Sequence, residues 1–554
     1  MFKEIIRLFS FLLCLLLAAS CSGQPLQQKK EFNRQDSLRG SITPERAWWD
    51  VVCYTVAINT DYLEKSIEGK CIIDFRVVSP GKRMQIDLQQ PMEIRRAYIG
   101  EEKFEFTREG NVYYINFPKE LPRGSFQSIT LVFGGNPRIA TRPPWDGGWI
   151  FAKDDLGRPW MSVACQGLGA SVWYPCKDHQ SDEPDSAFIN IAVPDTLVAV
   201  ANGRFLGKES FSAGMMTYRW AVKNPINNYN IVPYIGKYVN WRETFNGEKG
   251  KLDCEYWVLD YNLEKAKKQF TQVPTMLKCF EHWFGAFPFY EDGYKLVESP
   301  HLGMEHQSAV AYGNKFGNGY LGKDLSGSGW GNKWDFIIIH ESGHEWFANN
   351  ITTNDLADMW VHEGFTSYSE TLFTECEYGK EAGSDYLTGL RKNIKNDIPV
   401  IGPYGVNQEG SGDMYYKGSN LLHTVRSIID NDEKFRQILR GLNSTYYHKT
   451  VDSKDIEAYI SKQSGIDLSK VFDQYLRTVD VPVLEYKVRP GAVSFRWTNC
   501  VKGFDMKIKA EMIPGRVQWI RPTENWITLK LRDGYDGKTF IPDRNFYIQA
   551  KKVE

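Results

Sequence analysis

The sequence lacks a surplus of charge of either sign, and it lacks the cysteine spacing typical of metal or redox sites. Lys and Arg total 67 against 68 Asp and Glu, so the formal net charge is -1. Without a basic surplus there is no general electrostatic attraction to a polyanion, and we expect no nucleic-acid partner. The ten cysteines contain no CxxC pair, which argues against a cysteine zinc knuckle or a thioredoxin-like site.

Long apolar runs, internal repeats and low-complexity tracts are also missing after the first twenty residues. Hydrophobic residues make up 42% of the chain, aromatic residues 14% and charged residues 24%. This composition is typical of a globular protein and excludes a fibrous or mainly disordered one. A length of 554 residues predicts about three to five folding units.

The N-terminus has the layout of an export signal. Lys3 and Arg7 precede an apolar run over 8–17, and small residues follow directly before Cys21. The run is too short to span a bilayer, so we expect 1–21 to be a secretory signal peptide. The segment ending at Cys21 resembles a bacterial lipobox, which predicts a lipid anchor at Cys21 and a body facing the periplasm or the cell exterior. Ordinary signal-peptidase cleavage is the alternative.

Residues 22–46 are polar and nearly free of large apolar side chains, which predicts a flexible tether. The body contains eight cysteines at scattered positions. Cys53 and Cys71 could form a disulfide between neighbouring strands, and we interpret the remaining cysteines as core residues.

The body divides into three regions with different patterns. From 47 to 240, short β-rich runs alternate with turn residues, which indicates a β-sandwich or a curled, saddle-like sheet. From 241 to 481 helical spacing dominates, for example over 263–284, 334–349 and 359–378. From 482 to 554 strand-like runs return and predict a small β-sandwich domain. The expected fold class is therefore multidomain α+β.

The clearest chemical motif is His340-Glu341-Ser-Gly-His344. On a helix His340 and His344 lie one turn apart on the same face, so both imidazoles can bind one metal ion. Glu341 then projects beside them, where it can act on a water molecule. A catalytic zinc site needs a third protein ligand. Glu363 follows nineteen residues after His344 on the next expected helix and completes a His-His-Glu set.

This spacing, followed by Gly364-Phe365, resembles the gluzincins of the aminopeptidase N and leukotriene hydrolase family. Three further segments agree in order. Residues 302–306 (LGMEH) resemble the family's Gly-x-Met-Glu-Asn exopeptidase motif, residues 415–418 (YYKG) resemble its Tyr-Glu-Lys-Gly segment, and residues 165–167 (CQG) are similar to its upstream substrate-amine segment. The resemblance covers about residues 48–484.

The resemblance implies a thermolysin-like mixed α/β catalytic domain and a role for each matching residue. It implies one zinc ion bound by His340, His344 and Glu363, with Glu341 as general base. Tyr415 would stabilise the oxyanion. The substrate-binding residues would be Glu305 and Gln166 at the α-amine, with Gly303 and Met304 beside them, and Glu370 would orient a zinc-binding histidine.

Two positions depart from the family's exopeptidase motif. Leu302 replaces its first Gly, and His306 replaces its Asn. In the family these positions line the channel for the substrate backbone, so both substitutions bear on peptide binding and not on the metal.

The sequence therefore predicts an exported, lipid-anchored zinc aminopeptidase that cleaves the N-terminal bond of peptides with a free N-terminus. A zinc endopeptidase or an epoxide hydrolase with the same metal site is the alternative among enzymes. A peptide-binding lipoprotein is the alternative from another class, but a binding protein has no reason to keep every ligand, the base and the tyrosine.

Overall fold

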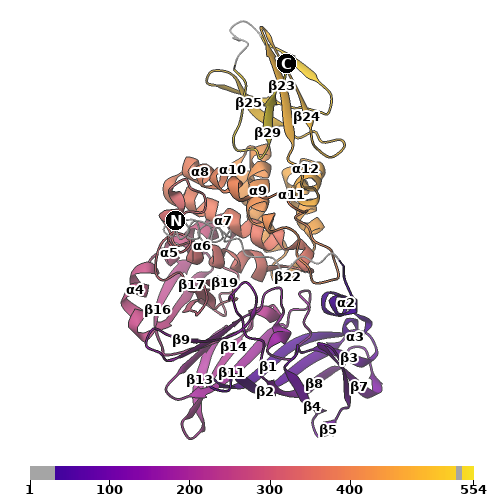
Figure 1. Ribbon diagram of the computed structural model, residues 1–554, viewed down its shortest axis with the longest axis vertical. Helices are drawn as coiled ribbons and strands as arrows, with labels where there is room; N and C mark the ends of the chain where they lie inside the picture. The colour runs from indigo at the N-terminus through magenta and orange to yellow at the C-terminus, as the bar shows by residue number, and fades with distance from the viewer. Residues whose placement is uncertain (1–30, 532–538) are drawn as a thin grey trace, which may run out of the picture.

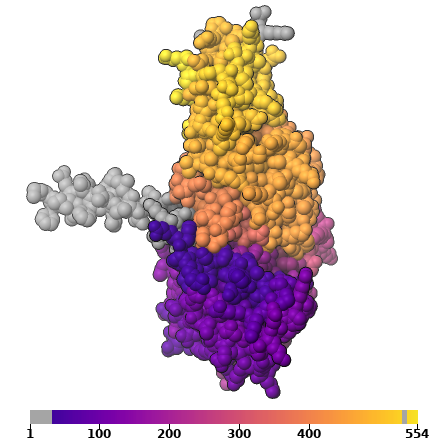
Figure 2. All heavy atoms as spheres, turned by 90° about the vertical axis from the view of Figure 1, so that its right-hand side faces the viewer, coloured from indigo at the N-terminus to yellow at the C-terminus, as the bar shows by residue number. Residues whose placement is uncertain are grey.

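The computed structural model describes residues 31–531 and 539–554. Three units follow one another along the chain and are stacked along the long axis of the molecule (Figure 1). The space-filling view shows the same order, with the C-terminal unit as a narrower projection from the middle unit (Figure 2). The predicted multidomain fold, with a helical unit between two sheet-rich ones, is confirmed.

The N-terminal unit contains three sheets. The largest has eight strands in the order β13-β14-β11-β1-β2-β8-β4-β5, and smaller sheets pair β12-β15-β10-β9 and β3-β7-β6. Alternate side chains of β1 are buried, as expected for strands with one face on the core. The strands are β1 (Trp49–Asp61), β2 (Ser66–Val77), β3 (Gly81–Asp87), β4 (Glu93–Ile99), β5 (Glu102–Lys103), β6 (Phe106–Glu109), β7 (Val112–Leu121), β8 (Phe126–Gly135), β9 (Gly148–Lys153), β10 (Pro159–Ala164), β11 (Ser186–Pro194), β12 (Val198–Ala201), β13 (Arg204–Ser212), β14 (Met215–Val222) and β15 (Pro233–Gly236).

The middle unit combines a five-stranded sheet, in the order β16-β17-β18-β20-β19, with a set of helices. Its sheet begins at Tyr238, slightly before the predicted boundary at 241. The sheet strands are β16 (Tyr238–Gly247), β17 (Gly250–Leu259), β18 (Tyr294–Glu298), β19 (Gly303–Met304) and β20 (Val310–Tyr312), and β21 (Ile351–Thr353) pairs with β22 (Lys449–Val451). The helices are α4 (Leu263–Gln269), α5 (Gln272–Phe284), α6 (Phe336–Gly343), α7 (Trp360–Tyr378), α8 (Lys380–Leu390), α9 (Tyr416–Ile429), α10 (Asp432–Thr445), α11 (Ser453–Ser464) and α12 (Ser469–Arg477).

The C-terminal unit has one four-stranded sheet, β27-β24-β23-β29, and one three-stranded sheet, β26-β25-β28. Its buried side chains, such as Trp497 and Ile508, belong to the same hydrophobic cluster as the helices of the middle unit. The two units therefore share a continuous core. The strands are β23 (Val483–Arg489), β24 (Ala492–Thr498), β25 (Ile508–Ile513), β26 (Arg516–Ile520), β27 (Ile527–Lys530), β28 (Ile541–Pro542) and β29 (Gln549–Lys552).

The predicted flexible tether is wrong for its second half. Residues 34–47 form two short helices, α2 (Arg34–Gly40) and α3 (Pro44–Ala47). Asn33 and Asp36 form a capping box that starts α2. Arg46 is fully buried and forms an ion pair of 2.6 Å with Asp87. Such a buried ion pair docks the segment onto the sheet, and composition alone does not reveal it.

The cysteine interpretation also needs correction at one pair. Cys279 on α5 and Cys376 on α7 form a disulfide, while Cys53 and Cys71 are free, buried thiols on β1 and β2. In the antiparallel register Cys71 faces Val56 and Cys53 faces Asp74, so the two cysteines are not cross-strand partners. The other buried free cysteines fit the prediction of core residues.

No helix within residues 31–531 and 539–554 is both long and apolar enough to cross a membrane. The predicted signal peptide with Cys21, and the tether up to residue 30, lie outside the described residues.

Candidate metal centre

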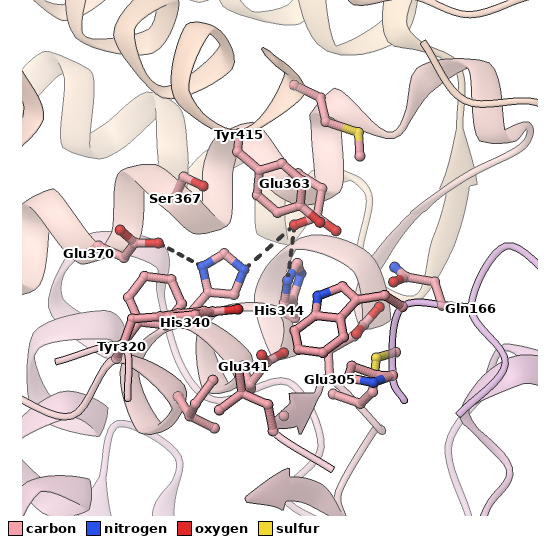
Figure 3. Close-up of a pocket in the computed structure, with 18 of the residues that line it drawn as sticks. Gln166, Glu305, Tyr320, His340, Glu341, His344, Glu363, Ser367, Glu370 and Tyr415 are labelled. Atoms are coloured by element: carbon pink, nitrogen blue, oxygen red, sulfur yellow. Dashed lines mark hydrogen bonds and ion pairs between the residues drawn. The ribbon is translucent and has the colours of Figure 1, made fainter. Parts of the chain in front are cut away.

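A pocket between the N-terminal and middle units contains all the predicted site residues. His340, Glu341, His344, Glu363, Tyr415, Glu305, Gln166, Gly303 and Met304 line it. Gln166 comes from the N-terminal unit and the others from the middle unit. Figure 3 shows Gln166 and Glu305 at one end of the pocket and Glu370 and Tyr320 at the other, with His340 and His344 between them. The sequence-predicted site residues thus converge on one cavity.

The two histidines are positioned by α6, whose start is fixed by Asp335. The Asp335 carboxylate accepts hydrogen bonds from the backbone N–H groups of Ile337 and Ile338, which caps the helix. The helix is buried, and the ring centroids of His340 and His344 lie 5.0 Å apart. Beyond His344 the backbone leaves helical geometry at Phe347 and Ala348, so the predicted helix over 334–349 is shorter than expected.

Glu363 on α7 lies beside both imidazoles. Its Oε2 is 3.6 Å from His340 Nε2 and 3.4 Å from His344 Nε2. The approach of α7 to α6 requires Gly343, because a Cβ there would lie 2.6 Å from Ser369 Oγ. Gly343 therefore allows the two helices to pack closely, and this packing offsets the low helix propensity of glycine.

A second layer of residues orients the imidazoles. His340 Nδ1 donates to Glu370 Oε1 at 2.7 Å, and the Tyr386 hydroxyl donates to the other Glu370 oxygen at 2.6 Å. His344 Nδ1 donates to the Phe347 carbonyl at 3.0 Å. A carbonyl oxygen can only accept, so the proton of His344 lies on Nδ1. The structure thus supports the predicted role of Glu370 as an orienting residue.

These contacts leave three lone-pair atoms facing one another, which fits a bound cation. With both Nδ1 atoms donating, His340 Nε2 and His344 Nε2 carry lone pairs toward Glu363. Among the described residues, Glu363 Oε2 is buried without a hydrogen-bond donor. The three ligand atoms lie within 4.8 Å of one another. Two imidazoles and one carboxylate are the ligand set of catalytic zinc sites, so these residues fit one zinc ion.

Glu341 lies next to the metal ligands without belonging to their set. Burial raises the pKa of its carboxyl to about 7, against the opposing effect of the two imidazoles. A bound cation would oppose this rise in the pKa. Gly303 on β19 leaves room for this carboxylate, since a Cβ at that position would lie 2.7 Å from Glu341 Oε1. The pocket therefore holds a buried carboxylate suited to proton transfer.

Tyr415 reaches the ligands from the start of α9. Its ring lies 6.0 Å from the His340 ring, and its pKa is raised by burial and by Glu363, Glu409 and Glu305. The hydroxyl therefore remains a hydrogen-bond donor. The helix start is held close to α7 by two glycines, because a Cβ on Gly418 would lie 2.9 Å from the Gly364 Cα. Two of the predicted motifs thus meet at this helix contact.

Glu305 is held on the His344 side of the pocket. One of its carboxylate oxygens lies within 4.8 Å of ligand atoms of Glu341 and His344. The Tyr229 hydroxyl donates to Glu305 Oε1 at 3.0 Å, and Asn349 Nδ2 donates to its backbone carbonyl. Burial raises the pKa of Glu305. A buried carboxylate in this position favours a cationic ligand group.

Leu302 and His306, the two departures from the family motif, differ in their position relative to the pocket. Leu302 lines the pocket and therefore shapes it. His306 is fully buried, its Nδ1 lies 2.5 Å from the Tyr234 hydroxyl, and it is not among the residues that line the pocket. The expected effect of His306 on the substrate channel is therefore not supported by its position, whereas that of Leu302 is.

Several residues in or around the pocket are not indicated by the sequence. Tyr229 acts through Glu305, Tyr386 through Glu370, and Tyr320 and Phe336 line the pocket beyond His340. None of them belongs to a motif or has ligand spacing. Of these four residues, only Phe336 could be placed near the site from the sequence, because it lies one helical turn before His340 on the same helix face.

Comparisons with known proteins place part of this chain in a known family. A family model described as the peptidase family M1 domain matches residues 273–475. The chain is 21% identical to leukotriene A-4 hydrolase of Xenopus laevis, over 75% of this chain and 66% of that protein. It is also 21% identical to aminopeptidase M1 of Arabidopsis thaliana, over 63% and 39%. The chain thus spans less than two thirds of the length of these relatives.

Among solved structures, the M1 zinc metallopeptidase from Deinococcus radiodurans has the same fold. Its TM-score is 0.68 at 18% identity, over 78% of this chain and 95% of that one. The residues that the family model matches include His340, Glu341, His344, Glu363 and Tyr415. On this evidence residues 273–475 are a peptidase family M1 domain, and the chain as a whole has the fold of the M1 zinc metallopeptidase.

Proposed function

We propose that the protein is a zinc aminopeptidase that removes the first residue from peptides with a free N-terminus. The observation that carries this proposal is the position of Glu305, a buried carboxylate held by Tyr229 within 4.8 Å of ligand atoms of Glu341 and His344. A protonated α-amine bound there places the first peptide bond of the substrate at the metal ligands. A charge-assisted hydrogen bond of this kind contributes about 1.5–3 kcal/mol.

The residues of the chain supply the remaining steps. A zinc ion bound by His340, His344 and Glu363 would lower the pKa of a water ligand to about 7 and polarise the scissile carbonyl. Glu341 accepts the proton of the attacking water and delivers it to the leaving amine. The Tyr415 hydroxyl donates to the developing oxyanion. Gln166 reaches the amine end of the pocket from the N-terminal unit (Figure 3).

Similar proteins support the substrate class. A mutant of the Deinococcus radiodurans enzyme has been solved with a Tyr-Ser-Ala substrate, and its chain matches this one with a TM-score of 0.65. A buried carboxylate at the amine end favours a substrate with a free α-amine over an internal segment of a longer peptide. A binding protein would have no use for the base.

The test compares free and N-acetylated forms of one peptide. Acetylation removes the positive charge, so we expect single residues to be released from the free peptide only. Glu305→Ala should lower kcat/KM at least tenfold. Efficient cleavage of an acetylated peptide at an internal bond would establish an endopeptidase and overturn the proposal, with the zinc chemistry intact.

We further propose that the protein is exported and lipid-anchored through Cys21. The small residues before Cys21 support this, and so does the disulfide between Cys279 and Cys376, since disulfides persist in oxidising compartments. Cys21→Ser should move the protein into the soluble fraction. Unchanged membrane association after that substitution would refute the anchor.

A further inference from the structure

Two aromatic side chains line the pocket on the far side of His340. The Phe336 ring is stacked on the His340 ring, with centroids 5.1 Å apart and planes at 15°. The Tyr320 ring meets Phe336 edge-on at 5.2 Å. Both residues line the same pocket as the metal ligands. We refer to Tyr320 and Phe336 together as the aromatic wall.

The aromatic wall and the amine-binding carboxylate lie on opposite sides of the metal ligands. Glu305 approaches His344 and Glu341, whereas the aromatic wall extends from His340. Figure 3 shows this arrangement, with Tyr320 at one end of the pocket, Glu305 and Gln166 at the other, and both histidines between them. A peptide bound by its α-amine at Glu305, with its first carbonyl at the ligands, therefore continues toward the aromatic wall.

Tyr320 is held in place before any substrate binds. Tyr320 and Lys323 exchange two backbone hydrogen bonds around Leu321 and Gly322, both of which have positive φ, as a tight two-residue turn requires. Asn314 supports the turn, since its side chain donates to the Gly319 carbonyl and accepts from the Leu321 N–H. A preformed apolar surface costs little to order on binding.

Glu370, which lies at this end of the pocket, is already engaged. Both oxygens of Glu370 accept hydrogen bonds, one from His340 and one from Tyr386. Glu370 is also only 2% exposed to solvent. It is therefore a poor partner for a basic substrate side chain, whereas the aromatic faces offer an apolar surface that a ligand can contact.

From this geometry we propose that the aromatic wall binds the side chain of the second substrate residue and selects peptides in which that residue is large and apolar. This inference rests on the proposed aminopeptidase activity, and it adds a preference at the leaving-group side of the cleaved bond. A hydrophobic pocket discriminates by about 10- to 200-fold for the gain or loss of a single methylene group. We expect at least a tenfold preference for Phe over Gly at this position.

The test uses tripeptides with a constant first residue, because a chromogenic leaving group would itself occupy the aromatic wall. The zinc-loaded protein is given Ala-Phe-Ala, Ala-Leu-Ala, Ala-Gly-Ala, Ala-Asp-Ala and Ala-Lys-Ala, and released alanine is measured. The expected order of kcat/KM places Phe and Leu at least tenfold above Gly, Asp and Lys. Equal rates for Phe and Gly, or the fastest rate for Lys, would overturn the proposal.

Variants then assign the preference to the aromatic wall. Tyr320→Ala should reduce the ratio of kcat/KM for Phe over Gly by at least threefold, whereas Tyr320→Phe, which keeps the ring, should retain it. Leu321→Ala is the matched control, since Leu321 belongs to the same turn but is 46% exposed and does not line the pocket. A Phe preference that persists in both Tyr320→Ala and Phe336→Ala would refute the assignment.

The same panel separates this inference from the proposed function. If the protein cleaves all five tripeptides without preference, the aminopeptidase stands and the aromatic wall does not bind the second residue. If it cleaves none of the five while it cuts an acetylated peptide internally, the aminopeptidase assignment fails and the inference fails with it.

Discussion

Glu341 and His344 lie three residues apart on one helix and yet have separable roles. His344 Nε2 faces Glu363, whereas the Glu341 carboxylate lies outside that ligand set and beside Gly303. We therefore expect His344 to bind the metal and Glu341 to transfer protons. The difference follows from helix geometry, because residues four apart share a face and the residue next to one of them is turned away.

Substitutions should separate metal binding from turnover. His344→Ala removes a ligand and should abolish zinc occupancy. Glu341→Gln should retain zinc and lower kcat by about 10²–10⁴, the usual contribution of general acid–base catalysis. Metal content and kcat measured on both variants test this expectation, and near-normal activity of Glu341→Gln would contradict it.

Tyr415 offers a second prediction at this scale. Because its raised pKa keeps the hydroxyl protonated, Tyr415→Phe should lower kcat by about 10²–10³ with little change in KM, as expected for a donor used in the transition state. Tyr416 is the neighbouring control, since it follows Tyr415 in the chain and also lines the pocket. A larger loss in Tyr416→Phe would show that the wrong tyrosine has been assigned.

Residues that belong to a motif were predicted from the sequence, whereas residues that act only through a tertiary contact were not. His340, His344 and Glu363 lie within one helix pair, where spacing fixes geometry. Tyr229 lies 76 residues before Glu305, on a different unit, and donates to it only because the two units are docked. Such a contact has no local pattern, and a single sequence does not reveal it.

At the level of elements, α7 connects most of the site. It carries Glu363 and Glu370, meets α6 at Gly343 and meets α9 at Gly418. Its last turn is tied to α5 by the Cys279–Cys376 disulfide. The helices of this unit were predicted because their spacing is regular. The break between α4 and α5 within 263–284 was not, since apolar spacing continues across it.

The disulfide should stabilise this helix pair. It closes a loop with a sequence separation of 97 residues, and removing a disulfide typically costs about 2–4 kcal/mol of unfolding free energy. Cys279→Ala with Cys376→Ala should therefore unfold at lower denaturant concentration than wild type. Cys500→Ala, which removes a half-buried free thiol of the C-terminal unit, is the matched control. No difference between the double variant and this control would contradict the prediction.

For the whole molecule, the decisive contact is the one between the N-terminal and middle units. The amine end of the pocket is complete only when Gln166 and Tyr229 of one unit meet Glu305 of the other. Polar contacts hold this boundary, including a hydrogen bond of 2.7 Å between Asn230 and Asn349. The order of the units was predictable from the strand-like and helical patterns of the sequence. The surface at which the units dock was not, since it depends on individual buried polar groups.

Asp292 provides a test of that docking. Asp292 is 1% exposed, and its carboxylate accepts hydrogen bonds from the Lys223 N–H and from the backbone and side chain of Asn224, across the boundary between the units. Asp292→Ala leaves these donors without an acceptor, and each buried unsatisfied group costs about 1–3 kcal/mol. We therefore expect a lower unfolding free energy, measured by denaturant titration, and a raised KM for free peptides with unchanged zinc content.

The matched control is Asp253, which lies at the exposed rim of the same boundary. It accepts from Arg204 at 2.7 Å, but its side chain is 58% exposed. Ion pairs in solvent contribute about 0–1 kcal/mol, so Asp253→Ala should change stability and KM little. If both variants lost the same unfolding free energy, burial of the contact would not be what holds the units together. If Asp292→Ala lost stability without any rise in KM, the amine end of the pocket would not depend on docking, and Gln166 and Tyr229 would have no part in substrate binding.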